Sequence, residues 1–283
     1  MHKKTEQLKL LMVGLGDLGG RIANLAVHQN FKVLGMRRGS VAPEQVQLMQ
    51  HDASQPWPEL PWIPDDIVLC LSPNGSNEMA YRQAYVDAAY QALKALSQHP
   101  LTHVWLISST GVYGQSAGEW VDETSERNPV RETAKVLLEA ENLWLHSGHP
   151  VTLLRPSGIY GPGRYFLIRQ AQQGILPPKD APIYTNRIHI DDATRAVLHL
   201  IQRRHQGHPP AGSYNLTDTE PAALYDILSW LHQQLGITDV TTANIDRDSK
   251  RIRHDRLKST GFSWNYPDFR MGYKEVLKTK TEG

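Results

Sequence analysis

The sequence has little of what secreted, membrane-bound or nucleic-acid-binding proteins need. Cys70 is the only cysteine in 283 residues, so no internal disulfide can form, which favours a reducing cytoplasm. It lies in an apolar run, residues 67–71, and we expect a buried strand residue there. No apolar run approaches the length of a transmembrane helix. The net charge of +1 gives no reason to expect nucleic acid or a membrane as partner.

A metal site is not expected either. The chain has thirteen histidines, but the pair His205 and His208 lies in a Gly/Pro turn with no acidic residue nearby in the sequence. The remaining candidates for partners are small molecules, and a segment near the start of the chain indicates which kind.

That segment is residues 10–19, where an apolar run ends in Gly14-Leu15-Gly16-Asp17-Leu18-Gly19. A Gly-x-Gly-x-x-Gly pattern between a strand and an amphipathic helix is typical of a dinucleotide-binding βαβ unit. Gly14 would permit the tight turn, Gly16 the close approach of a pyrophosphate, and Gly19 the close packing of the helix. The pyrophosphate would lie at the helix N-terminus. The alternative is an ordinary strand–turn–helix without a nucleotide.

The second predicted strand, residues 31–36, ends at Arg37-Arg38. NAD-binding proteins usually place an acidic residue here, which binds the ribose hydroxyls. Two guanidiniums can bind the 2′-phosphate of NADP instead, whereas an acidic side chain would repel that phosphate. We therefore expect NADP to be preferred, with NAD as the other nicotinamide cofactor. Two solvated surface arginines are the alternative interpretation.

Strands and helices alternate along most of the chain, which predicts an α/β fold with a Rossmann-type doubly wound parallel sheet. Further strands are expected at residues 46–52, 66–71, 104–109, 151–155 and 213–216, and helices at residues 77–97, 130–146 and 221–235. Asp191 or Asp192 is placed to cap another helix. Residues 1–155 and 185–220 form the predicted dinucleotide-binding domain; residues 156–184 and 221–283 form a small C-terminal substrate lobe.

Four segments after the glycine turn carry further motifs. They are SSTGVYG at 108–114, LRPSGIYGPG at 154–163, IHIDDA at 188–193 and YNL at 214–216. In this order, over residues 8–220, the chain resembles the extended short-chain dehydrogenase/reductase family. That family includes the NAD-dependent epimerases and dehydratases of nucleotide sugars. Its dimers often form through the helices that match residues 77–97 and 130–146, so a homodimer is one expected assembly.

The resemblance implies roles for individual residues. Ser109, with Thr110 beside it, would hydrogen-bond the reacting oxygen. The cofactor would contact Gly14, Gly16, Asp17, Leu18, Gly19, Arg37, Arg38, Asp52, Leu71, Ser72, Pro73, Ser108, Lys135 and Pro156. The substrate, a sugar nucleotide or another small carbonyl or hydroxyl compound, would contact Tyr160, Arg164 and Arg187. Arg155 is a further candidate for an anionic substrate, with a structural role as the alternative.

The chain departs from the family at the catalytic tyrosine. The family uses a Tyr-x-x-x-Lys pair on a helix, but here residues 131–135 read Arg-Glu-Thr-Ala-Lys. Arginine stays protonated, so Arg131 cannot cycle a proton. Tyr113 and Tyr160 are replacement candidates, although both also fit ordinary motif positions. Lys135 would contact the cofactor or form a surface pair with Glu139.

Two functions therefore remain open. One is an NADP-dependent oxidoreductase or epimerase-like enzyme with a non-standard active site. The other is a non-catalytic NADP(H)-binding sensor or regulatory protein. Two smaller expectations complete the prediction: Asp191 is a helix cap or a partner for Arg187, and the basic run 250–256 is a solvated surface segment.

Overall fold

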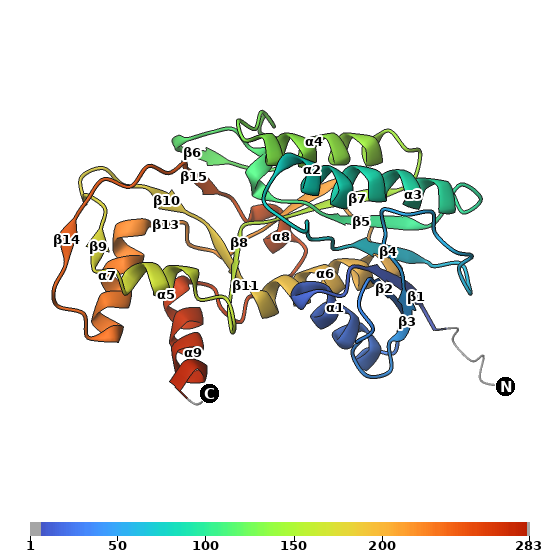
Figure 1. The fold of residues 1–283 in the computed structure, drawn as a ribbon, viewed down its shortest axis with the longest axis horizontal. Helices are drawn as coiled ribbons and strands as arrows, with labels where there is room; N and C mark the ends of the chain where they lie inside the picture. The colour runs from blue at the N-terminus through green and yellow to red at the C-terminus, as the bar shows by residue number, and fades with distance from the viewer. Residues whose placement is uncertain (1–6, 282–283) are drawn as a thin grey trace. The chain divides into compact units, whose positions relative to one another are not determined.

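The computed structural model describes residues 7–281, which form two compact units (Figure 1). The first unit contains residues up to 112 together with residues 129–155 and 194–214. The second contains residues 113–128, 156–193 and those from 215 onward. Each unit is therefore made of several stretches of chain.

The first unit holds a seven-stranded sheet with the order β12-β7-β5-β4-β1-β2-β3. Its strands are β1 (Lys9–Val13), β2 (Lys32–Arg37), β3 (Gln47–Gln50), β4 (Asp66–Leu69), β5 (His103–Ile107), β7 (Val151–Pro156) and β12 (Ser213–Leu216). The pairs from β3 to β7 are parallel. The chain proceeds outward from β1 first to β3 and then to β12. The predicted doubly wound parallel sheet is confirmed.

Helices cover both faces of this sheet (Figure 1). On one face lie α1 (Asp17–His28) and α6 (Ile190–His205); on the other lie α4 (Glu132–Leu145) and a helical segment made of α2 (Glu78–Tyr81), η1 (Arg82–Asp87) and α3 (Ala88–Ala95). The sequence predicts one helix at 77–97, whereas the structure places a π-helical turn, η1, in its middle. The Tyr85 hydroxyl in this turn donates to the Leu71 carbonyl at 3.0 Å.

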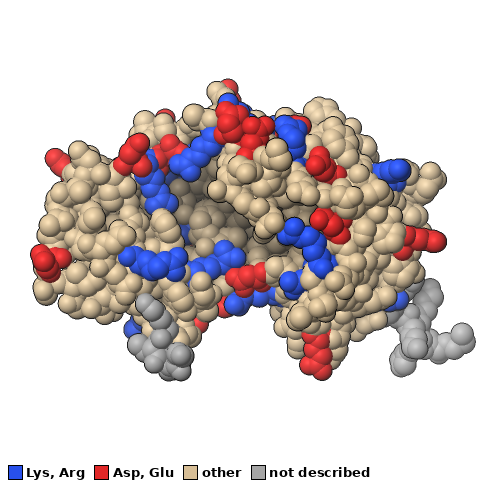
Figure 2. Space-filling model, in the orientation of Figure 1, with Lys and Arg blue, Asp and Glu red and all other residues tan. Residues whose placement is uncertain are grey.

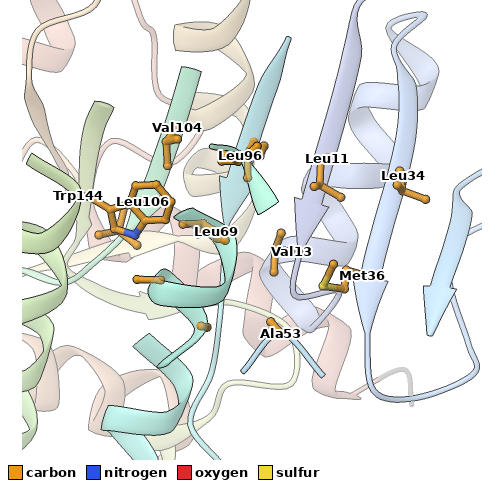
Figure 3. Packing of buried hydrophobic residues seen from close by; sticks show 14 of the residues in the cluster. Leu11, Val13, Leu34, Met36, Ala53, Leu69, Leu96, Val104, Leu106 and Trp144 are labelled. Atoms are coloured by element: carbon orange, nitrogen blue, oxygen red, sulfur yellow. The ribbon is translucent and has the colours of Figure 1, made fainter. Parts of the chain in front are cut away.

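The core beneath α3 and α4 explains why the strands read as continuous apolar runs. Leu11 and Val13 of β1 and Leu34 and Met36 of β2 share one face and pack in a cluster with Trp144 (Figure 3). The alternate residues of the same strands are buried on the other face. A parallel strand that is buried on both faces has no polar face, so its sequence does not alternate between apolar and polar residues.

The second unit is built from shorter elements. They are β6 (Ala117–Val121), β8 (Gly158–Tyr160), α5 (Phe166–Ala171), β9 (Ile175–Leu176), β10 (Tyr184–Thr185), β11 (Arg187–His189), β13 (Ala222–Ala223), α7 (Leu224–Leu235), β14 (Thr241–Thr242), β15 (Ser249–Ile252), α8 (Asp255–Ser259) and α9 (Phe269–Thr281). Its core forms where α5, α7 and α9 meet, around Leu228, Leu231 and Phe269.

Two sequence predictions are wrong in this unit. Helix α6 begins at Ile190, so Asp191 and Asp192 lie in its first turn and neither is its N-cap. The Asp192 carboxylate accepts hydrogen bonds from the backbone N–H groups of Asn265 and Tyr266, at 2.9 and 2.8 Å. It therefore anchors the loop before α9.

The basic run 250–256 is also not a simple solvated segment. Its first part belongs to β15, which pairs in parallel with β6. Ile252 is fully buried, and the Lys250 ammonium donates to the Tyr113 carbonyl.

The surface and the helices add two observations. Figure 2 shows that Lys, Arg, Asp and Glu side chains all occur on the visible face. Within the described residues, no helix is both long enough and apolar enough to cross a membrane.

An ion pair in the first unit is completely buried. Arg155 of β7 binds Glu141 of α4 through two hydrogen bonds of 2.9 and 2.8 Å, and the two residues are 2% and 0% exposed. Two buried charges stabilise a fold only as a pair, because either one alone would lack the solvation it had in water. Of the two roles considered for Arg155, the structure supports the structural one.

Helix α4 offers a matched comparison for this pair. Glu139 also forms two hydrogen bonds, with Arg82, but these side chains are 41% and 43% exposed. We expect Glu141→Gln to lower the free energy of unfolding by about 3–5 kcal/mol, because it removes the carboxylate charge that pairs with the buried Arg155 guanidinium. Glu139→Gln should lower it far less, since solvent screens the exposed pair. Urea unfolding of both variants checks this; equal losses would contradict it.

Candidate functional site

A cavity of about 330 Å³ lies in the first unit at the carboxyl ends of its strands. Its walls come from the glycine turn after β1, the end of β2, residues 51–54 after β3, residues 70–72 after β4, and the helical segment that contains η1. In open parallel sheets, ligands bind beyond this edge. The cavity is therefore the candidate site.

The three glycines of the turn are in different steric environments. A Cβ on Gly14, whose φ is 96°, would lie 2.2 Å from the Cys70 carbonyl oxygen, and one on Gly19 would lie 1.9 Å from the Gly14 carbonyl oxygen. A Cβ on Gly16 would meet no atom within 4 Å. The packing of the backbone therefore requires glycine at positions 14 and 19. It does not require glycine at position 16, where the absence of a side chain leaves open space.

That open space lies at the start of α1. The helix begins at Asp17, and Gly16 in the N-cap position provides no side-chain hydrogen bond to the helix. The first turn of a helix has N–H groups without partners in the helix, and the helix dipole favours an anion there. The residues present thus fit a pyrophosphate.

Charged side chains form the far wall of the cavity, at the ends of β2 and β3. Arg37 and Arg38 both line it, and Arg37 Nη1 donates to the Val41 carbonyl at 2.8 Å. Burial opposes ionisation of Asp52, but hydrogen bonds from Ser54 and the charges of Arg38 and His51 lower the pKa of this carboxyl overall. The wall therefore combines two guanidiniums with one carboxylate.

The structure brings about half of the predicted cofactor residues to this cavity. Those that line it are Gly14, Gly16, Arg37, Arg38, Asp52, Leu71 and Ser72. Those that do not line it are Asp17, Leu18, Gly19, Pro73, Ser108, Lys135 and Pro156.

The sequence prediction missed the helical wall of the cavity. Ala80, Ala84 and Ala88 line it, as does Gln83. A four-residue spacing of small side chains places them near one helix face and could have indicated this wall. Cys70 is a correction: β4 ends at Leu69, and the cysteine lies just after it, half-buried in the cavity wall.

The predicted polar residues of the reaction lie at the end of β5 and the start of α4. The Ser109 Oγ accepts a hydrogen bond from the Gly111 backbone N–H at 3.0 Å. Thr110 begins the 3-10 turn η2 (Thr110–Val112). Lys135 pairs with Glu132 at 2.7 Å and not with Glu139, which binds Arg82. Arg131 occupies the N-cap position of α4.

The two candidate tyrosines are buried. Tyr113 is 1% exposed, and its hydroxyl donates to Asn215 Oδ1 at 2.9 Å. Tyr160 packs into the core of the second unit, and burial raises the pKa of its hydroxyl above the ordinary value. Both environments favour the structural interpretation of these tyrosines over an acid–base role.

The predicted substrate arginines differ in their surroundings. Arg187 is 3% exposed, donates to the Thr185 carbonyl at 2.7 Å, and lies 3.8 Å from Asp218. Burial raises the pKa of the Asp218 carboxyl to about 8, although the charge of Arg187 opposes this shift. Arg164 is half-buried in the turn after β8, where its N–H donates to the Gly161 carbonyl.

His205 has an acidic partner that the sequence analysis missed. It ends α6, and its Nε2 contacts the carboxylate of Asp66 at the start of β4. The two residues are far apart in the sequence, so only the fold reveals the pair. Among residues 7–281, no cluster of three His, Cys, Asp or Glu side chains could hold a metal ion.

The glycine turn allows a test of which glycines the fold itself requires. We expect Gly16→Ala to leave the melting temperature nearly unchanged, since its Cβ would enter open space. Gly19→Ala should lower the melting temperature by several degrees, because the backbone must shift to accommodate it. Thermal unfolding of both variants measures this; an equal loss at Gly16 would show that the space is not free.

Comparisons with known proteins were consistent with this geometry. Residues 11–216 match the NAD dependent epimerase/dehydratase family. Protein YeeZ of Escherichia coli (strain K12) is 30% identical over 278 residues, which cover 92% of this chain and 97% of that protein.

Solved structures are similar over almost the whole chain. A protein from Methylobacillus flagellatus, assigned to the NAD-dependent epimerases/dehydratases, is 34% identical with a TM-score of 0.82, covering 98% of this chain and 100% of that one. MoeE5 in complex with UDP-glucuronic acid and NAD shares the fold at 19% identity, with a TM-score of 0.76 and coverage of 98% and 100%. The chain belongs to the NAD dependent epimerase/dehydratase family, within the extended short-chain dehydrogenases/reductases.

Proposed function

We propose that the cavity binds a nicotinamide dinucleotide, with its pyrophosphate at the N-terminus of α1. The observation that carries the proposal is the open space at Gly16, between two glycines whose side chains the fold excludes. Family membership supports it, because the family is described as NAD dependent. A solved structure of the same fold is a complex with NAD.

We further propose that NADP is the preferred cofactor. Arg37 and Arg38 line the cavity at the end of β2, where the 2′-position of the adenosine would lie in a Rossmann-type site. Guanidiniums bind phosphate through paired, charge-assisted hydrogen bonds. Because both side chains line the cavity, this interpretation is favoured over two solvated surface arginines.

The reaction that we propose is of the oxidoreductase or epimerase type. The bound nicotinamide would supply or accept a hydride. Ser109, with Thr110 beside it, would hydrogen-bond the reacting oxygen, and Lys135 would bind the nicotinamide ribose. Leu71, Pro73, Ser108 and Pro156 stay candidates for further cofactor contacts.

The substrate proposal is a sugar nucleotide or another small carbonyl or hydroxyl compound. UDP-glucuronic acid in the complex with MoeE5 supports this class by analogy of fold. We propose that the second unit provides the substrate lobe, with Tyr160, Arg164 and Arg187 as candidates. The homodimer and the cytoplasmic location stay predictions.

Two features favour the second candidate function, a non-catalytic NADP(H) sensor. By the motif match, Arg131 would stand at the position of the family's tyrosine, and the hydroxyl of Tyr113 donates to Asn215 Oδ1. Turnover with a panel of nucleotide sugars and small carbonyl compounds separates the two functions. A sensor would bind NADPH tightly, show no turnover, and bind a partner protein in a cofactor-dependent way.

The cofactor proposal is tested by titrating NADPH and NADH while following nicotinamide fluorescence. We expect wild type to bind NADPH more tightly than NADH. Arg37→Ala/Arg38→Ala should weaken NADPH binding at least about 10-fold, because a charged hydrogen bond contributes about 1.5–3 kcal/mol. NADH affinity should change much less. Arg203→Ala, on α6 and outside the cavity lining, is the matched control.

Two results would count against the proposal. Equal or tighter binding of NADH by wild type would remove the NADP preference. If neither nucleotide binds, the glycine turn is only a scaffold, and dinucleotide chemistry is ruled out for this cavity.

A further inference from the structure

The loop that joins β4 to α2 contains Asn74-Gly75, the only Asn-Gly pair in the sequence. Asn74 is exposed and lines the cavity of the candidate site, together with Ser72 of the same loop. The structure therefore places this dipeptide at the wall of the cavity in which a dinucleotide is proposed to bind.

The backbone of this loop requires glycine at position 75. The φ of Gly75 is 143°, in a region that residues with a Cβ rarely adopt. A Cβ would lie 3.4 Å from the Ala80 Cβ, which is an ordinary contact, so the backbone angle and not a lack of space sets the requirement. Asn74 is thus followed by a residue whose backbone nitrogen is not shielded by a side chain of its own.

Hydrogen bonding distinguishes Asn74 from the next asparagine along the chain. Within residues 7–281, no hydrogen bond involves the Asn74 side-chain amide or the Gly75 N–H. By contrast, Asn77 Oδ1 accepts from the Ala80 N–H at 2.9 Å. The side chain of Asn77 is therefore held in place, whereas that of Asn74 can rotate toward the backbone nitrogen of Gly75.

These features match the requirements of deamidation through a cyclic imide, the reaction that makes asparagine a thermolabile residue. The Gly75 nitrogen loses its proton to a base in solution and attacks Asn74 Cγ. The new N–Cγ bond forms as the Cγ–Nδ2 bond breaks, and Nδ2 takes up a proton and leaves as ammonia. Water then adds to either carbonyl carbon of the imide and opens the ring to aspartate or isoaspartate. The only reactant besides the protein is water.

We propose that Asn74 is a site of spontaneous deamidation, and that the carboxylate formed there weakens dinucleotide binding in the cavity. The second half of this inference rests on the proposed function, because a carboxylate repels a ligand only where that ligand is anionic. Gly14, Gly16 and Ser72 line the same cavity as Asn74, so the new charge would share it with the pyrophosphate. Each molecule would then lose cofactor affinity irreversibly with age.

The first half is tested by incubating the folded protein in mildly alkaline buffer and mapping its peptides by mass spectrometry. We expect Asn74 to deamidate faster than any other asparagine and to give both aspartate and isoaspartate. The reaction should accelerate as the pH rises, because the attacking nitrogen must lose a proton. No reaction at Asn74 in the folded protein, under conditions in which the urea-unfolded chain deamidates there, would overturn the proposal.

The second half is tested with Asn74→Asp, which carries the charge of the product from the start. Titration of NADPH, followed by nicotinamide fluorescence, should show binding about 5-fold weaker than in wild type, the effect of one like charge near a solvent-exposed site. The difference should shrink as salt is added. Incubated wild type should lose NADPH affinity as Asn74 deamidates, whereas incubated Asn74→Ser should keep its own initial affinity.

Asn77→Asp is the matched control, because it adds the same charge three residues along the chain. Asn77 is exposed, does not line the cavity, and caps α2, a role that aspartate fills equally well. This variant should bind NADPH as tightly as wild type.

Two results would overturn the second half: equal NADPH affinities of Asn74→Asp and wild type, or equal losses in Asn74→Asp and Asn77→Asp. If wild type binds no dinucleotide, the proposed function fails and the second half fails with it. The peptide map still decides whether Asn74 deamidates, because that measurement needs no ligand.

Discussion

Close backbone contact at the glycine turn is the constraint on which the first unit depends. The missing side chain of Gly14 lets the turn after β1 approach the Cys70 carbonyl after β4, and that of Gly19 lets α1 approach the turn itself. Two strand ends and a helix start are thereby held within van der Waals distance. Gly16 has no such neighbour, so the rigid frame encloses free space at a helix N-terminus. The site is a consequence of how the fold packs.

Charge is distributed differently in the two units. In the first, the buried Arg155–Glu141 pair fixes α4 to β7, and the arginines at the end of β2 line the cavity. In the second, Arg187 and Asp218 are buried. Arg251 lies close to the rings of Tyr184 and Trp120, and no carboxylate of the described residues lies within ion-pair distance of it. A cation paired inside the protein contributes to folding, whereas a fixed cation without a paired anion is available to a ligand.

Local patterns predicted most of the fold. The apolar runs of β1, β2, β4 and β5 and the glycine turn are properties of adjacent residues, and they led to the parallel sheet. The π-helical turn could not be foreseen, because its residues also suit an ordinary helix and Tyr85 finds its acceptor at Leu71, fourteen positions away. The short basic strand β15 depends on pairing with β6, which lies more than a hundred residues earlier.

The candidate site was predictable to a similar extent. Glycines and arginines at strand ends identified one wall of the cavity, since the carboxyl ends of parallel strands meet at one edge. The helical wall with Gln83 and the partners of Lys135 and His205 were missed. The spacing of Ala80, Ala84 and Ala88 could have indicated the helical wall. The partners of Lys135 and His205 depend on a rotamer and on a tertiary contact between distant segments, which spacing along the chain does not determine.

The central claim is that this cavity binds a dinucleotide. The N-terminus of α1 would bind its pyrophosphate, and the arginines at the end of β2 would bind its 2′-phosphate. The crystal structure of the protein with NADPH tests it most directly. The account predicts the pyrophosphate beside Gly16 and the 2′-phosphate about 2.7–2.9 Å from the guanidinium nitrogens of Arg37 or Arg38. A dinucleotide bound outside this cavity, or one whose 2′-phosphate faces away from both arginines, would contradict it.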